Sequence, residues 1–161
     1  MDIKKLIGEG GQMKGVWIVT IRDALTGKIK RRHVFENIIP TIGRNAVARS
    51  LAGEAVTLAE IEINETSLGT NATAPTNGDI KLGTETFRKA VASTTSSGNQ
   101  LFVTAFYTAP EVSGTFSEAG LHINGTGAPD SGVLFSRVIF SPAVTKSASE
   151  TLTVDYVVTI T

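Results

Sequence analysis

GNQLFVTAFYTAPEVSGTFSEAGLHINGTGAPDSGVLFSRVIF, residues 98–140, carries the densest apolar alternation in the chain. Residues 99–108 alternate bulky and small side chains, and turn-forming residues flank them on both sides. Residues 117–123 follow as a short strand, residues 124–132 turn the chain, and residues 133–140 return. The pattern predicts three β-strands joined by two turns. No residue here is placed for chemistry, so we expect a scaffold whose function lies on its surfaces.

Composition limits the class of protein. The chain has 161 residues, which is enough for one domain with a real core and too few for a second full domain. Hydrophobic residues make up 41% and charged residues 19%, a globular rather than a disordered composition. Cysteine is absent, which excludes disulfides, thiolate metal sites and cysteine nucleophiles.

The first 13 residues predict a flexible N-terminal arm. They include Lys4 and Lys5, followed by the glycine-rich run GEGGQ at 8–12. No apolar run has the length of a signal peptide or of a membrane span. We therefore expect a protein made in the cytoplasm and not secreted by a signal peptide.

Charge is distributed unevenly along the chain, although the formal net charge is zero. Residues 1–50 hold ten Lys and Arg against four Asp and Glu, whereas residues 51–161 hold five against eleven. The two parts therefore carry +6 and −6. The two parts can pair with each other, or the basic part can dock on an acidic neighbour or on nucleic acid. Between copies of the chain packed side by side, the asymmetry would favour head-to-tail contacts.

Residues 14–36 predict a basic hairpin, with strands at 14–22 and 28–36 and a turn at 23–27. Cations occur on both faces of the second strand, which a central strand could not bury, so we expect an edge strand or a protruding ribbon. The cations suit either nucleic acid or an acidic protein. Stacking aromatics are not interleaved with them, which favours the protein. The predicted partner-binding residues are Lys4, Lys5, Lys28, Lys30, Arg31 and Arg32.

The remaining segments predict one short helix and further strands. Residues 41–52 form the helix, with Thr41 as its N-cap and Gly53 at its stop. We expect a strand at 56–64, a polar surface loop at 67–79, a break at Ser141-Pro142 and a last strand at 150–161. About eight or nine strands in this order predict an all-β fold over residues 14–161, a single antiparallel β-sandwich of Greek-key or jelly-roll-like arrangement.

No arrangement of residues predicts catalysis, a cofactor site or a metal site. His33 and His122 lie far apart, and the chain has no Gly-x-Ser-x-Gly sequence and no evident base for a nucleophile. Glu60 and Glu62 share one face of the predicted strand, where solvated carboxylates are commoner than a glycosidase pair. Calcium ligation and turn formation both suit Asn77, Asp79 and Asp130, and we favour turn formation.

Several short sequences together resemble small virion structural proteins of tailed bacteriophages. They are RDALTG at 22–27, ENII at 36–39, GRNAVAR at 43–49, LGTETFR at 82–88, FSEAGL at 116–121 and SETLTVDY at 149–156. The resemblance spans roughly residues 15–161. Proteins of this kind serve as head decoration or cement proteins, as neck and tail components, and as attachment domains of tail fibres. The resemblance implies a β-sandwich that assembles on a viral particle, often as a trimer.

The expected function is that of a non-enzymatic virion component, a decoration, cement or neck-associated protein. Its sandwich would pack against copies of itself, and residues 1–36 would anchor it to the major capsid protein or to a neck or tail protein. Neither a membrane nor nucleic acid is expected as a partner. The alternative is a receptor- or glycan-binding module of a tail fibre or tail tip, with loop 66–79 and either loop 109–116 or loop 124–132 as its contact surface.

Overall fold

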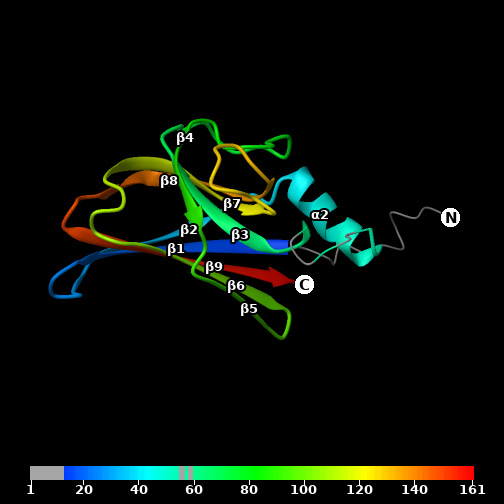
Figure 1. The fold of residues 1–161 in the computed structure, drawn as a ribbon, viewed down its shortest axis with the longest axis horizontal. Helices are drawn as coiled ribbons and strands as arrows, with labels where there is room; N and C mark the ends of the chain where they lie inside the picture. The colour runs from blue at the N-terminus through cyan, green and yellow to red at the C-terminus, as the bar shows by residue number, and fades with distance from the viewer. Residues whose placement is uncertain (1–12, 55–56, 58–59) are drawn as a thin grey trace.

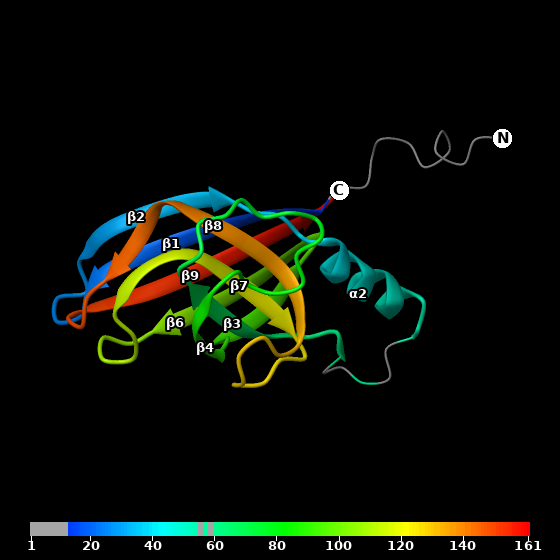
Figure 2. The same ribbon diagram turned by 90° about the horizontal axis from the view of Figure 1, so that it is seen from above.

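The computed structural model describes residues 13–54, 57 and 60–161. These residues form nine β-strands and one α-helix. Figures 1 and 2 show them as a flattened body with the helix at one end. The elements are β1 (Met13–Asp23), β2 (Ile29–Glu36), α2 (Thr41–Leu51), β3 (Ile63–Gly69), β4 (Glu85–Ala90), β5 (Ser93–Ser97), β6 (Gln100–Tyr107), β7 (Gly114–Ile123), β8 (Val133–Lys146) and β9 (Glu150–Ile160).

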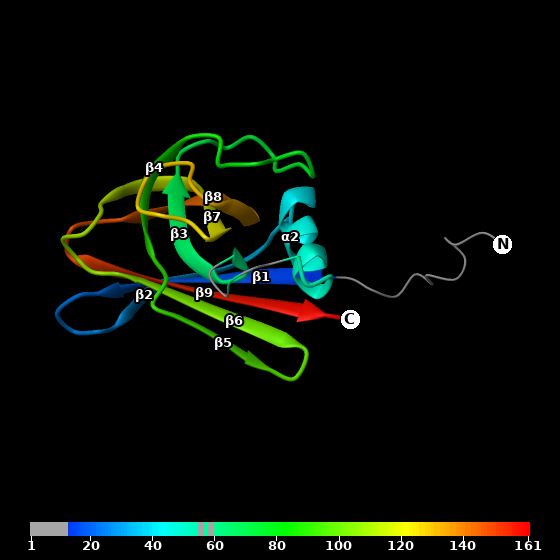
Figure 3. The same cartoon turned by 45° about the vertical axis from the view of Figure 1, so that its right-hand side comes forward.

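The strands form two antiparallel sheets that pack face to face. One sheet has five strands in the order β2-β1-β9-β6-β5, and the other has four in the order β4-β3-β7-β8. Figure 3 shows the two layers and places α2 at the end where the C-terminus lies. The predicted all-β sandwich with one short helix is thus confirmed, and the Greek-key or jelly-roll arrangement stays a prediction.

The core lies between the sheets and is lined by alternate residues of each strand. Trp17 of β1 and Tyr156 of β9 are opposite each other in the five-stranded sheet, and their ring centroids lie 5.4 Å apart. The Trp17 indole N–H donates a hydrogen bond of 3.1 Å to Ser136 Oγ of β8. This bond joins the two sheets. It also gives a partner to the indole N–H of Trp17, the largest fully buried side chain, which would otherwise be buried without one.

The three strands predicted within residues 98–140 are present as β6, β7 and β8, yet they do not form one sheet. β7 and β8 pair as a hairpin in the four-stranded sheet, whereas β6 pairs with β9 and β5 in the five-stranded sheet. The connection between β6 and β7 therefore crosses from one layer to the other. Alternation in sequence identifies a strand but says nothing of its neighbour.

Two sequence expectations around β3 are wrong. The strand predicted over residues 56–64 begins at Ile63, and residues 60–62 precede it as turn and coil; residues 55, 56, 58 and 59 lie outside the described set. The polar surface loop predicted over residues 67–79 begins inside β3, where Ser67 and Leu68 are fully buried. Polar side chains are tolerated there because they find partners: Thr66 Oγ1 lies 3.1 Å from the Tyr107 hydroxyl.

The expected break at Ser141-Pro142 is also wrong. β8 continues through this cis peptide to Lys146. The register between β7 and β8 shifts between Phe116 and Glu118, so the extra residues of β8 form a bulge rather than an end.

Helix α2 lies against β8. Its N-cap is one residue before Thr41, the N-cap expected from the sequence. Pro40 is the N-cap, with φ −61° and ψ 164°, and Thr41 is the first helical residue. Gly43 is the buried residue of the helix, because the helix approaches the β8 backbone there. Gly53 follows the helix with φ +71°, the left-handed conformation that glycine adopts at helix ends.

Replacing Gly43 tests this close approach. A Cβ at this position would lie 2.7 Å from the carbonyl oxygen of Phe135, a backbone atom. We expect Gly43→Ala to lower the free energy of unfolding by about 1–3 kcal/mol in urea denaturation, because helix and strand must separate. Asn45→Ala, an exposed change in the same helix, is the control and should cost less than about 0.5 kcal/mol. Equal stability of the two variants would contradict the packing described.

Candidate functional site

The turn of the basic hairpin is held by Asp23. Its Oδ1 accepts hydrogen bonds from the backbone N–H groups of Leu25 (3.1 Å) and Thr26 (2.9 Å) and from the Thr26 hydroxyl (2.9 Å). These bonds, led by the one from the Thr26 backbone, lower the pKa of the Asp23 carboxyl. Gly27 closes the turn with φ +70°. The hairpin tip is therefore a defined shape, with Leu25 97% exposed at its end.

Two of the predicted partner-binding cations are bound within the molecule. Lys30 Nζ and Arg31 Nη2 each lie 2.9 Å from a carboxylate oxygen of Glu150, at the start of β9. The Glu150 side chain is only 4% exposed, whereas those of Lys30 and Arg31 are 41% and 40% exposed. Arg31 also donates to the carbonyl of Thr145 at 3.0 Å. These contacts fix β2 to the start of β9.

The other predicted cations divide into two groups. Lys28 and Arg32 are exposed, and neither side chain forms an ion pair with another described residue. Ile29 and Val34 beside them are 45% and 64% exposed, so this edge of the sheet combines positive charge with apolar surface. Of the two expected arrangements, an edge strand or a protruding ribbon, the structure shows the edge strand. Lys4 and Lys5 lie outside the described residues.

A second group of charged side chains is buried in the four-stranded sheet. These residues were not among those predicted from the sequence. Glu118 of β7 is fully buried. Its carboxylate accepts backbone hydrogen bonds from Thr84 (2.7 Å), Gly83 (3.0 Å) and Asn71 (3.3 Å). One side chain therefore holds both ends of the connection between β3 and β4.

Arg137 of β8 neutralises Glu118. Its guanidinium donates to Glu118 Oε2 at 3.0 Å, to Asp79 Oδ2 at 2.7 Å and to the carbonyl of Thr73 at 3.1 Å. Burial would raise the pKa of Asp79, but hydrogen bonds from Thr76 and Arg137 lower it overall. The guanidinium binds both the sheet and the β3–β4 connection, which turns a long loop into a fixed one.

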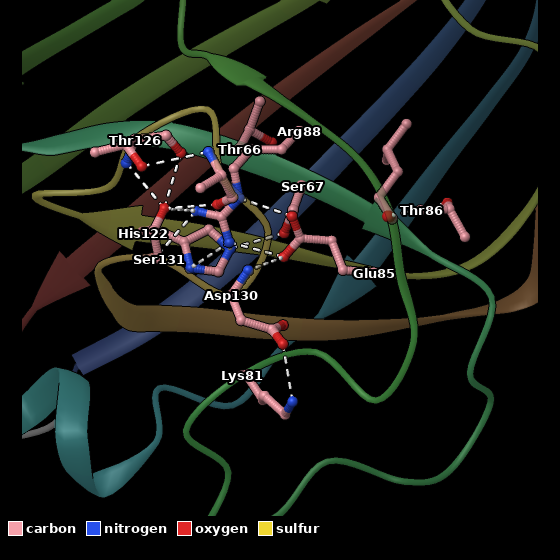
Figure 4. A network of polar contacts seen from close by, with 12 residues as sticks. Thr66, Ser67, Lys81, Glu85, Thr86, Arg88, His122, Thr126, Asp130 and Ser131 are labelled. Atoms are coloured by element: carbon pink, nitrogen blue, oxygen red, sulfur yellow. Dashed lines mark hydrogen bonds and ion pairs between the residues drawn. The ribbon is translucent and has the colours of Figure 1, made fainter.

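A histidine and a serine come together beside this group, as Figure 4 shows. Ser67 Oγ and His122 Nε2 lie 2.7 Å apart, and Arg88 Nη2 lies 3.3 Å from the same ring nitrogen. Arg88 is held by Glu85 through two hydrogen bonds of 2.7 Å. Burial, and then the charge of Arg88, lower the pKa of His122 to about 3, so the imidazole is neutral at neutral pH.

Ser67 and His122 lie as close together as a catalytic nucleophile and its general base, but their surroundings differ from those of a catalytic pair. Both residues are buried, with exposed fractions of 0% and 1%, so a substrate has no access. The Glu85 carboxylate binds Arg88, and Glu65, opposite His122 in the sheet, forms no hydrogen bond to the imidazole among the described residues. Arg88 also donates to the Ser131 carbonyl at 2.9 Å, so the cluster anchors loop 124–132.

A third buried charge anchors the connection between β6 and β7. Lys146, at the end of β8, is 1% exposed. Its ammonium donates to the carbonyls of Val112 (2.7 Å) and Ala109 (2.9 Å). Burial lowers the pKa of the Lys146 ammonium. All three loops that the alternative function would use as a contact surface are thus tied down by charged side chains of the four-stranded sheet.

The end of the sandwich beside α2 is hollowed. A cavity of about 360 Å³ is lined by Ala46, Arg49, Glu54, Glu60, Ile61, Asn124 and Val133. A smaller one of about 150 Å³ shares Ala46 and Ile61 and is also lined by Val47, Ser50 and Leu51 of α2 and by Ile123. In the described part of the chain no group of three or more His, Asp or Glu is arranged to hold a metal ion.

Comparison with known proteins adds no relative: no family model, curated protein or solved structure matches the chain. Nor is any helix among the described residues both long and apolar enough to cross a bilayer.

The contact between Glu150 and the hairpin predicts a pH-dependent stability. Hydrogen bonds from Lys30, from the Ser147 backbone N–H and from Arg31 hold the pKa of the Glu150 carboxyl at about 2, below its usual 4.5. The stabilisation is therefore complete above pH 4.5 and is lost as the pH falls toward 2. We expect Glu150→Gln to lower the free energy of unfolding by about 1–2 kcal/mol at pH 7, and by much less near pH 2. Urea denaturation across this range measures the difference. Glu36→Gln, an exposed change in the same hairpin, should show no such gap.

Arg137 can be tested against an exposed arginine. Arg137→Met leaves Glu118 and Asp79 without their cation, and we expect a loss of about 3–5 kcal/mol in unfolding free energy. Backbone amides of residues 70–84 should also exchange hydrogen faster, because the loop loses its anchor. Arg49→Met, which removes an exposed ion pair with Glu54, should cost less than about 1 kcal/mol. A similar cost for both arginines would show that Arg137 does not organise the loop.

Proposed function

We propose that this chain is a non-enzymatic structural component of a tailed-phage virion, a decoration, cement or neck-associated protein. It assembles through its β-sandwich and anchors through its basic hairpin and N-terminal arm to another virion protein. The observation that supports the proposal most is the free edge of the five-stranded sheet. There the exposed Lys28 and Arg32 lie among exposed apolar side chains, a surface suited to an acidic protein neighbour.

The buried charged residues also support this proposal. Glu118, Arg137, Arg88 and Lys146 are all engaged in holding loops, and the serine next to His122 has no access to solvent. These side chains stabilise shape. A protein that functions by fitting between neighbours needs such fixed loops, because loop disorder would add to the entropic cost of each contact.

The alternative, a receptor- or glycan-binding module, has less support. Sugar-binding surfaces commonly present aromatic rings. Among the loops 66–79, 109–116 and 124–132 the one aromatic residue is Phe116, which is buried at 3% exposure. Trp17 and Tyr107 lie in the core.

Charge reversal of the edge tests the anchor. We expect Lys28→Glu/Arg32→Glu to fold normally but to be lost from particles purified from infected cells in which it is the only copy. Deletion of residues 1–12, which removes Lys4 and Lys5, should have the same effect. Arg49→Glu/Lys81→Glu makes the same change in net charge elsewhere on the surface and should still be incorporated. Incorporation of the edge variant at the level of the control would refute the proposed anchor.

A further inference from the structure

The two outer faces of the sandwich differ. The outer face of the four-stranded sheet is covered by the chain's own loops: Leu82 of the β3–β4 connection is buried beside Gly120 of β7. Figures 1 and 3 show β1, β9, β6 and β5 along the lower side of the body, with the other sheet and its connections above them. No element among the described residues lies below. The outer face of the five-stranded sheet is therefore open.

The open face carries apolar side chains. Because Trp17, Val103 and Val154 point into the core, the residues that alternate with them along each strand point outward. Six of the outward residues are apolar and come from four neighbouring strands: Val16, Ile18, Val34, Phe102, Phe106 and Val157. All six are at least partly exposed.

Most of these side chains form a connected patch. Val16, Val157 and Phe102 lie in one row across β1, β9 and β6. In the next row, Val34 of β2 lies beside Ile18 of β1. An antiparallel sheet with one solvated face usually carries polar residues on that face. The pattern therefore indicates a face that another molecule covers.

The surroundings of the patch are polar but almost free of charge on one side. The other outward residues of β9, β6 and β5 are serine, threonine and glutamine, with Asp155 as the one charged side chain. β1 and β2 carry further charges on this face, among them Lys14, Arg22, Arg32 and Glu36. An apolar centre with an uncharged polar rim is typical of a protein–protein contact, and here it is centred on β9 and β6.

The partner that suits this face best is a second copy of the chain. With neighbouring strands about 4.8 Å apart and outward residues about 6.7 Å apart, the face formed by β1, β9, β6 and β5 covers about 500 Å². Two copies would bury about 1,000 Å² in total, close to the minimum for a specific interface. The single charge of β9, β6 and β5 offers little to a strongly charged foreign partner, for which the basic edge of β2 is better suited.

We propose that two copies of this chain pack by the outer faces of their five-stranded sheets, about a two-fold axis that runs along the strands between β9 and β6. Val157 of each copy then faces Phe102 of the other, because these residues are opposite each other in the sheet. Each β2 stays outside the contact, beyond β5 of the other copy. An axis across the strands would instead stack the two β2 strands and their cations. The contact is isologous, so it closes at two copies.

This inference rests on the proposed function, since it names the surface by which the sandwich would assemble. It also leaves the basic edge of β2 accessible in the pair, so that one copy can bind its twin and an acidic neighbour at the same time. A pair presents two such edges, which strengthens attachment to a particle through multivalency.

Asp155 gives the pair a distinctive response to mutation. Its carboxylate accepts a hydrogen bond of 2.9 Å from Thr104 Oγ1 of the neighbouring strand. The two-fold axis brings the two Asp155 carboxylates close together, and their repulsion weakens the pair. Asp155→Asn keeps the acceptor for Thr104 and removes the repulsion, so the dissociation constant of the pair should fall about 3- to 10-fold. A weaker pair in this variant would contradict the two-fold arrangement.

Sedimentation velocity of the purified full-length protein over a range of concentrations measures the association. We expect a wild type that reaches a dimer and nothing larger. Phe106→Lys, at a residue that is 41% exposed, and Val157→Lys should each raise the dissociation constant about 10- to 100-fold, because a charge enters the apolar patch. Ile80→Lys makes the same kind of change at a residue that is 65% exposed on the β3–β4 connection, and it should associate like the wild type. Circular dichroism checks that each variant folds.

A single introduced cysteine tests the geometry, since the chain has none of its own. On oxidation, Val157→Cys should form a disulfide-linked dimer at a concentration that leaves Ile80→Cys monomeric, although Ile80 is the more exposed position. Equal cross-linking of the two overturns the inference. So does a wild type that stays monomeric at every concentration, whether or not another protein binds the open face, and so does a dimer that both lysine variants retain. These measurements involve no particle, so their failure is distinct from failure of the incorporation test.

Discussion

Arg137 is the residue at which the separate parts of this sandwich meet. Its backbone pairs with Ile38 in both directions, at 3.0 and 3.1 Å, which fixes the segment between β2 and α2 to the four-stranded sheet. Its side chain binds Glu118 and Asp79, and Glu118 in turn holds the connection between β3 and β4. A buried guanidinium is stable only where carboxylates and carbonyls satisfy it, so its partners and their loops must adopt one arrangement together.

The same principle recurs across the four-stranded sheet. Arg88 with Glu85 fixes one loop, and Lys146 fixes another through backbone carbonyls. Charged residues that would otherwise serve a partner or a substrate are thus used inside the fold. Along the free edge of β2, by contrast, exposed charges and apolar side chains lie side by side.

Alternation of apolar residues was enough to predict most strands, the basic hairpin and the sandwich. It failed at β3, because Thr66 and Ser67 are polar residues buried by hydrogen bonding to Tyr107 and His122. It also placed Lys30 and Arg31 among the free cations. Their partner Glu150 lies about 120 residues away in sequence, and no local pattern indicates such a contact. The pair Glu118 and Arg137 is only 19 residues apart, but no pattern in the two strands marks charged side chains as buried. Glycines did give a usable signal: Gly53 marked the end of α2, as expected.

The position of β9 has a consequence for synthesis on the ribosome. This strand lies in the middle of the five-stranded sheet, between β1 and β6, yet it comprises residues 150–160. β1 emerges early in translation but has only β2 to pair with until β9 has been made. The central pairing then closes a loop of more than a hundred residues, which is slow by comparison with local contacts. A nascent chain of this protein must therefore keep its first hairpin from aggregating until its last strand has been translated.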